Sequence, residues 1–329
     1  MIYKKFINMI KIFSIIPVYL FFIFLLLGCA GSVQVPEYNS ALTAYDQGKY
    51  QTTITFINRA IEIDKNQSNY YLLRAKANYK VGNKNLAMED LNKSLNIERN
   101  FEALYLKGKL FLEDYELEKA KENFRAAYEL NPLSAGLLFD LGYLEYLNGE
   151  NQLALEYYTK AARYDSTNSA VFVNIGNLYA MMRNSEMAVE NYSTALALGT
   201  TDGIAYYNRA NEKMIMGDIK GAIDDYKNYL VIDSTDISAL YILAEAQTYI
   251  NDITGALESY DKIIRLDSTS AKAYYLRGTG EISLKKNDQA CYNFKKAGNL
   301  GYFQAYEMIK KYCEPKQNTK KKVNKKSKR

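Results

Sequence analysis

The residues able to do chemistry are few, and their types exclude most catalytic mechanisms. The 329-residue chain has no His, so it lacks the commonest general base and the commonest metal ligand. Ser-His-Asp and Cys-His nucleophiles are excluded, as is a zinc site that needs imidazole. Carboxylates are plentiful, but for pairs such as Asp224-Asp225 we expect ordinary solvated charge on a helix face. We therefore expect no enzyme activity, no metal site and no cofactor.

Three cysteines remain, and the first, Cys29, ends an apolar segment. Lys4, Lys5 and Lys11 open the chain without any acidic residue, and a mostly apolar run follows over 12–27. This order of basic and apolar segments is typical of an export signal. The sequence therefore predicts a signal peptide over 1–28.

The last four residues of this segment, Leu26-Leu27-Gly28-Cys29, resemble the lipobox of bacterial lipoproteins. The resemblance implies that Cys29 is lipidated and becomes the first mature residue, with 29–36 as the lipidated Cys and its tether. No acidic residue follows at Ala30-Gly31-Ser32, which by resemblance to sorting rules favours the outer membrane. Two alternatives stay open: an uncleaved membrane anchor, and an ordinary signal peptide with a chance cysteine.

A unit of about 34 residues recurs through most of the chain and must position everything else. Each unit contains two amphipathic stretches joined by a polar turn. Counting within the unit, position 8 is always Gly or Ala, position 20 is Ala in seven of eight copies, and position 24 is always large and apolar. Position 8 is Ala41, Ala75, Gly108, Gly142, Gly176, Ala210, Ala244 and Gly278. Small residues at fixed places let two helices approach closely while large ones fill the space beside them.

Helix ends repeat with the same period. Good N-cap residues precede five first helices, and glycine opens four of the turns inside the units. The predicted N-caps are Ser134, Asn168, Asp202, Asp236 and Ser270, and the turn glycines are Gly48, Gly82, Gly149 and Gly217.

This pattern resembles the tetratricopeptide repeat (TPR). The small position 8, Ala at 20, the aromatic residue at 24 and an occasional Pro (Pro132) are marks of that family. Departures are Thr53 in the first, degenerate copy, Tyr229 and Ile263 at position 27, and Asp-Ser-Thr where Pro is usual. The resemblance implies an all-α, right-handed superhelical solenoid of about eight helix-turn-helix units over 37–300.

In that family the first helices line the inner wall of the superhelix. By the family's register, positions 2, 5, 9, 12 and 13 face inward and form the predicted groove. Aromatic side chains with a polar tip are favoured anchors at protein interfaces. The candidate partner-binding residues are Tyr105, Phe139, Tyr143, Tyr146, Asn177, Met181, Tyr207, Asn211, Met214, Tyr241, Tyr249 and Tyr275. The alternative is that these residues only solvate a helix face.

The last two cysteines lie where the array ends. Residues 301–313 are predicted to form a helix that caps the eighth unit, since solenoids need such a cap for solubility. If the turn is centred near 300–301, Cys313 lies about one helical turn from the residue opposite Cys291. A disulfide between Cys291 and Cys313 is then within reach in an exported protein, and the alternative is two buried thiols.

The final segment, 314–329, is predicted to be a disordered basic tail. Residues 315–329 contain eight Lys or Arg and no acid, and 1–28 contain three Lys and no acid. Between them the chain is mildly acidic, with 31 basic and 37 acidic residues, which does not favour nucleic-acid binding. The tail, 316–329, is a candidate for contact with an anionic surface, and the alternative is a tail that is only solvated.

Together these features predict a non-enzymatic TPR scaffold, lipid-anchored in a bacterial envelope. Its partner would be a protein or peptide bound in the aromatic groove, and it would assemble or maintain an envelope complex. The alternative function is an adaptor that binds anionic lipid or cell-wall polymer through its basic tail.

Overall fold

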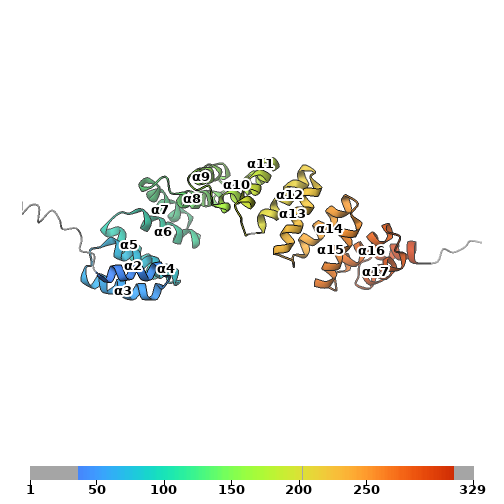
Figure 1. Cartoon of the computed structure of the whole chain (residues 1–329), viewed down its shortest axis with the longest axis horizontal. Coiled ribbons are helices and arrows are strands. Elements are labelled where there is room, and N and C mark those ends of the chain that lie inside the picture. Colours follow the sequence, from blue (N-terminus) through green and yellow to red (C-terminus); the bar gives the residue numbers. More distant parts are fainter. Residues whose placement is uncertain (1–35, 202, 315–329) are drawn as a thin grey trace, which may run out of the picture. The chain divides into compact units, whose positions relative to one another are not determined.

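The computed structural model describes residues 36–201 and 203–314, and the described chain contains helices and no strands. The predicted leader, Cys29, most of its tether, the tail from 315 and the predicted N-cap Asp202 lie outside the described residues. The chain divides into two compact units, with the boundary after Leu144. In each unit consecutive helices fold back on one another as hairpins (Figure 1).

The first unit holds three complete helix pairs and the first ten residues of a further helix. The pairs are α2 (Pro36–Asp46) with α3 (Tyr50–Ile63), α4 (Ser68–Lys80) with α5 (Lys84–Ile97), and α6 (Phe101–Glu113) with α7 (Leu117–Leu130). The further helix is α8 (Ala135–Leu147).

The second unit holds the last residues of α8, then α9 and four helix pairs. These helices are α9 (Asn151–Tyr164), α10 (Ser169–Met181), α11 (Ser185–Ala197), α12 (Ile204–Met216), α13 (Ile219–Ile232), α14 (Ile237–Tyr249), α15 (Ile253–Leu266), α16 (Ala271–Ser283) and α17 (Asn287–Asn299). The described array is thus made of consecutive helix pairs, as the 34-residue period predicts.

In three copies the glycine at position 8 lies under the large residue at position 24 of the same copy. A Cβ added to Gly176 would lie 2.6 Å from Cε1 of Tyr192, and one on Gly278 would lie 2.8 Å from Cε1 of Phe294. Both rings are buried, as is the Ala at position 20. Any side chain at these glycines would have to displace a core ring, which explains the fixed spacing of small and large residues.

The turns inside the pairs use a left-handed residue, as the four predicted glycines indicate. Gly48, Gly82, Gly149 and Gly217 all have φ between +72° and +86°. Four other copies reach the same conformation without glycine, at Tyr115, Arg183, Asn251 and Lys285. The turn geometry therefore belongs to every one of these copies, and glycine only lowers its cost.

Helix starts agree with most of the predicted caps. Asn168 and Asp236 accept hydrogen bonds from Ala170 N and Ala239 N, and Ser134 Oγ accepts from Leu137 N. The prediction for Ser270 is wrong in its detail, because its side chain makes no cap bond. Its hydroxyl lies 2.8 Å from the hydroxyl of Tyr241 instead.

The Asp-Ser-Thr segments replace the family's usual Pro with a side-chain turn. Asp165 Oδ1 accepts from both the backbone N–H and the hydroxyl of Thr167, and Asp267 does the same with Thr269. These bonds from threonine hold the pKa of both aspartates below the usual range. The connection between units is thus fixed by hydrogen bonds where proline would fix it by its ring.

Candidate functional site

Seven residues of the second unit line a hollow of about 450 Å³, here called the α14–α16 hollow. Two of them, Tyr241 and Tyr249, belong to the groove predicted from the sequence. They come from α14, which also gives Glu245 and Thr248, while α15 gives Tyr260 and α16 gives Lys272 and Leu276. The hollow is therefore formed by residues of two first helices around one core tyrosine.

The chemistry of this hollow is aromatic with one charge of each sign. Tyr249 is 79% exposed, whereas Tyr241 is half-buried and has its pKa raised by burial. Lys272 Nζ lies 4.8 Å from the centroid of the Tyr241 ring, within cation–π range. Glu245 and Lys272 add one carboxylate and one ammonium to the lining of the hollow. Such a hollow suits an apolar or aromatic side chain flanked by charge.

The inner wall of the first unit has a different chemistry. The hydroxyl of Tyr105 donates to Asp140 Oδ2 at 2.7 Å, and the hydroxyl of Tyr79 donates to Glu113. Lys84 Nζ lies 2.8 Å from the second oxygen of Glu113. The hydrogen bond to the Glu113 carboxylate, followed by burial, raises the pKa of Tyr79 to about 12. Tyr105, a predicted groove residue, is thus bound to a carboxylate of its own wall.

Burial also raises the pKa values of the other tyrosine–carboxylate pair, Tyr105 and Asp140. It raises the pKa of Tyr105, with the charge of Asp140 adding to the shift. Burial also raises the pKa of Asp140, although the bond from Tyr105 works against it. The pair is therefore a desolvated structural contact.

Two predicted groove residues, Asn177 and Asn211, have structural roles. Asn177 Oδ1 accepts from Tyr192 at 2.8 Å and from Asn208 Nδ2 at 2.9 Å, which uses both lone pairs of that oxygen. Asn211 Oδ1 accepts from the hydroxyl of Tyr226. The amide oxygens of both asparagines are thus engaged within the array.

The remaining predicted residues divide by exposure. Tyr143, Tyr146 and Met181 are exposed, while Phe139, Tyr207, Met214 and Tyr275 are half-buried. The Tyr207 ring packs against Tyr229 with centroids 5.2 Å apart, and the Tyr275 ring packs against Tyr302 at 4.8 Å. Tyr249 therefore combines high exposure with a place in a hollow, which makes it the best residue to probe.

Sequence reasoning missed three arginines, each of which joins three helices. Each lies at position 7 and donates to a residue sixteen positions before it and to another sixteen positions after it. The sixteen-residue spacing was a usable signal, because it equals the distance from a first helix to the second helices on either side. The sets are Arg74 with Asn58 and Asp90, Arg209 with Ser193 and Asp225, and Arg277 with Asp261 and Asn293.

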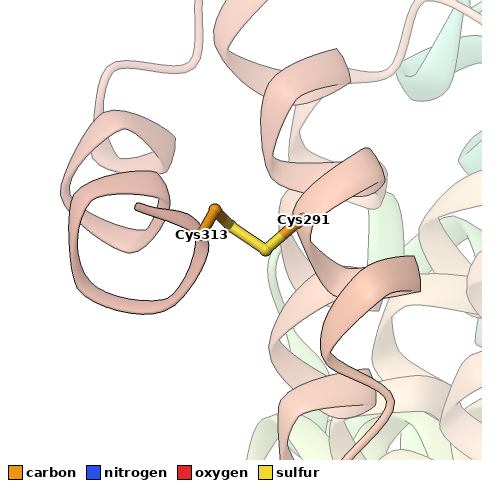
Figure 2. The surroundings of a disulfide bond; sticks show 2 residues. All are labelled: Cys291 and Cys313. Carbon is orange, nitrogen blue, oxygen red and sulfur yellow. A yellow bond between two sulfur atoms is a disulfide. The ribbon is translucent and has the colours of Figure 1, made fainter. Parts of the chain in front are cut away.

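The end of the array carries a disulfide between Cys291 on α17 and Cys313 (Figure 2). Their sulfur atoms are 2.08 Å apart and their Cα atoms 5.5 Å apart. The predicted capping helix over 301–313 starts only at Gln304 and changes type along its length. Gly301 is left-handed, α18 covers only Gln304–Met308, and a π-helical turn, η1, follows over Ile309–Cys313. A thiol count on the purified protein checks the bond, since two free thiols would contradict it.

Within 36–201 and 203–314, no group of three or more His, Cys, Asp or Glu side chains is placed to hold a metal ion. No helix of these ranges is long and apolar enough to cross a membrane.

Comparison with known families identifies the repeat. Two models of the tetratricopeptide repeat family match the chain, over residues 68–101 and 105–169. The matched ranges fall on the helix pairs from α4 to α9.

Curated relatives match only in part. The chain is 35% identical over 72 residues to the BBSome complex member bbs-4 of Caenorhabditis elegans. This stretch covers 22% of the present chain and 16% of bbs-4. It is also 27% identical over 122 residues to tetratricopeptide repeat protein 6 of Homo sapiens. This stretch covers 37% of the present chain and 24% of the human protein. The chain thus spans less than a quarter of either relative.

Solved structures show the same fold over longer stretches. The C-terminal part of a TPR repeat-containing protein from Cytophaga hutchinsonii has a TM-score of 0.60 at 22% identity and covers 72% of this chain and 97% of that one. PilF of Pseudomonas aeruginosa has a TM-score of 0.58 at 18% identity, and the match covers 64% of this chain and 96% of PilF. At these identities the likeness concerns the fold alone.

Proposed function

Because the chain is a tetratricopeptide-repeat protein, we propose that it is a non-enzymatic scaffold that binds a protein or peptide through the inner wall of its first helices. Proteins of this family are generally non-catalytic scaffolds. The α14–α16 hollow carries the proposal, because two predicted groove residues, Tyr241 and Tyr249, border open space there.

The hollow suggests what the partner offers. An apolar or aromatic side chain would enter between Tyr241, Tyr249 and Leu276, and it would remove apolar surface from water on both sides. Residues next to it on the partner would meet the Lys272 ammonium and the Glu245 carboxylate. A peptide with an acidic residue on one side of the anchor and a basic residue on the other fits this arrangement.

Site-specific crosslinking tests this proposal directly. A photoreactive amino acid at position 249 should capture a defined partner, and the same group at position 164 should not. Tyr164 is the matched control, because it is also an exposed tyrosine (53%) but lies at the end of a second helix. Equal capture from both positions, or capture from neither, would contradict binding in the hollow.

The scaffold is further proposed to be lipid-anchored at Cys29 in the bacterial envelope, on the outer membrane, where it would assemble or maintain a membrane complex. The basic start, the apolar run and Leu26-Leu27-Gly28-Cys29 support this location. Replacing Cys29 by Ser should release the protein from membranes in fractionation. Continued membrane retention of Cys29→Ser would indicate an uncleaved anchor.

A second candidate function is an adaptor that binds an anionic surface through residues 316–329. The excess of eight basic residues without an acid over 315–329 supports it. Deleting 316–329 separates the two functions. Loss of binding to anionic vesicles or cell-wall sacculi, with capture at position 249 retained, favours the adaptor.

A further inference from the structure

One buried carboxylate of the second unit breaks the repeat pattern. Glu212 stands at position 10 of the sixth copy, on α12. The same position is Ala, Leu or Gly in six of the other seven copies and Thr in the first. Five of these small or apolar residues are at most 1% exposed: Ala77, Leu110, Leu144, Leu178 and Ala246. Glu212 therefore places a carboxylate where the array otherwise buries apolar side chains.

One oxygen of this carboxylate has no partner in the described part of the chain. Glu212 is 8% exposed, and its Oε2 is enclosed without a hydrogen bond. The neighbouring cations of α12, Arg209 and Lys213, both pair with Asp225 instead. A charge that is buried without a partner destabilises a fold. A position that breaks the local pattern at the expense of stability is typical of a functional site.

The surroundings of Glu212 belong to the inner wall. Asn211, a predicted groove residue, is its neighbour in the chain. Asn208, one helical turn before it, donates to Asn177 Oδ1 of the preceding copy, and so does the hydroxyl of Tyr192. Burial raises the pKa of Tyr192 and the charge of Glu212 adds to the shift, so the carboxylate lies near that hydroxyl. All three asparagines are half-buried, so polar groups that reach the surface surround the Glu212 carboxylate.

We propose that Glu212 accepts a positively charged side chain, Lys or Arg, from a peptide bound on the inner wall of the second unit. The ammonium or guanidinium would donate to the carboxylate in a desolvated place, where a charge-assisted hydrogen bond is strong. The inference rests on the proposed function only in placing a peptide on this wall. It adds a cation-binding position one copy before the α14–α16 hollow.

A side-chain cation suits this position better than a metal ion does. Metal ions are held by several protein ligands at once. Over 36–201 and 203–314, no three His, Cys, Asp or Glu side chains are grouped in a way that could bind one. A single carboxylate among amides and a hydroxyl matches the single charge of a Lys or Arg side chain.

Selection from a displayed library of random peptides tests the proposal on the purified chain. Peptides that the parent retains should share a Lys or Arg, and both Glu212→Gln and Glu212→Leu should lose this preference. Glu190→Gln is the matched control, because it makes the same chemical change at an exposed residue of α11. An unchanged basic preference with Glu212→Gln would overturn the proposal.

One selected peptide then measures the contact. Replacing its basic residue by Gln should weaken binding to the parent by about tenfold or more, because a desolvated charge pair is lost. The same replacement should change little with Glu212→Gln, since that chain lacks the charge. Equal weakening in both chains would assign the cation to another carboxylate and would disprove the Glu212 site.

Hydrogen exchange of the peptide-free protein gives an independent measurement. Glu212→Leu and Glu212→Gln should both slow exchange in α12, because the unpaired buried charge is gone. Leu is the residue at this position in three other copies, so it fits the local packing. Unchanged or faster exchange with both variants would show that the carboxylate is already satisfied without a peptide, which contradicts the proposal.

The α14–α16 hollow can be tested separately with the same library. Tyr249→Ser should remove the preference for an apolar or aromatic anchor and keep the basic preference, and Glu212→Gln should do the reverse. If only Tyr249→Ser alters the selected peptides, the hollow stands and the Glu212 site is disproved. If only Glu212→Gln alters them, the Glu212 site stands and binding in the hollow is disproved.

Discussion

The inner walls of the two units contain tyrosines at the same repeat position with opposite consequences. Tyr105 and Tyr241 both stand at position 5 of their first helix. Position 6 of the following copy is Asp140 in the first unit and Leu276 in the second. Asp140 accepts the hydroxyl of Tyr105, whereas Leu276 lines a hollow beside Tyr241. For these two tyrosines, the residue at position 6 of the following copy decides whether the wall beside the ring holds a carboxylate or a hollow.

The buried cores of the two units differ in a similar way. Asp90 and Asp225 occupy the same position, and each is at most 5% exposed. The expectation that the Asp224-Asp225 pair is solvated charge is therefore wrong for Asp225, which is buried against two cations. Asp90 has one cationic partner, Arg74, at 2.7 Å. Asp225 has two, Arg209 at 2.6 Å and Lys213 at 2.8 Å. The buried aspartate at this position thus has one cationic partner in the first unit and two in the second.

The largest expected effect comes from removing one arginine in each unit. Arg74→Met leaves the Asp90 carboxylate buried without a cation, which should cost about 3 kcal/mol of local stability. Arg209→Met should cost clearly less, because Lys213 remains beside Asp225. Hydrogen exchange of α5 and α13, followed by mass spectrometry, measures both. If α5 and α13 lost equal protection from exchange, Lys213 would not compensate for the loss of Arg209.

A smaller effect is expected when the two inner walls are made alike. Leu276→Asp places a hydrated carboxylate in the hollow, so an apolar anchor should bind about tenfold more weakly. Leu276→Met is the control, because it keeps volume and polarity and should change little. The yield of crosslinked partner from position 249 measures the change. An unaltered yield with Leu276→Asp would place the partner elsewhere on the wall.

The smallest effect is a change in the pKa of one tyrosine in each unit. The pKa should fall in the first unit and rise in the second. Glu113→Gln should lower the pKa of Tyr79 from about 12 toward its ordinary value, because the hydrogen bond to that carboxylate is the main cause of the shift. Ser270→Ala should raise the pKa of Tyr241, since the bond to Ser270 opposes the effect of burial. Alkaline titration of tyrosinate absorbance measures both, and shifts of the same sign would contradict this account.

The Tyr79 shift also implies a dependence of stability on pH. Its folded pKa is above the ordinary value of 10, so its contribution to stability is complete below about pH 10 and is lost as pH rises through about 12. Glu113→Gln should lose less stability over that interval. Urea unfolding of the first unit at several alkaline pH values compares the two.

Much of the fold could be predicted from particular residues. The alternation of Gly176 with Tyr192 and of Gly278 with Phe294 requires helices in close contact, and the structure packs these rings over these glycines. The cap could not be predicted as well. Nothing in the sequence of 301–313 distinguishes a single α-helix from a five-residue helix followed by a π-helical turn, because the difference depends on how the segment meets α17.

The candidate site was predictable in outline only. The register places Tyr105, Asn177 and Tyr241 on the inner wall, but it does not say what each hydroxyl or amide meets. That depends on residues in the next first helix or at its N-cap: Asp140 for Tyr105, Asn208 for Asn177 and Ser270 for Tyr241.

The sequence by itself thus determined the repeat, the helix pairs, the left-handed turns and the absence of histidine chemistry. Each of these depends on local backbone preference or on packing inside one 34-residue copy, so a single copy contains the information. The tertiary structure alone decided which tyrosines remain open to a partner, because the contacts that Tyr105 and Tyr241 make join side chains about thirty residues apart. It also decided that the cap presents Phe303 outward, because burial is a property of the assembled chain.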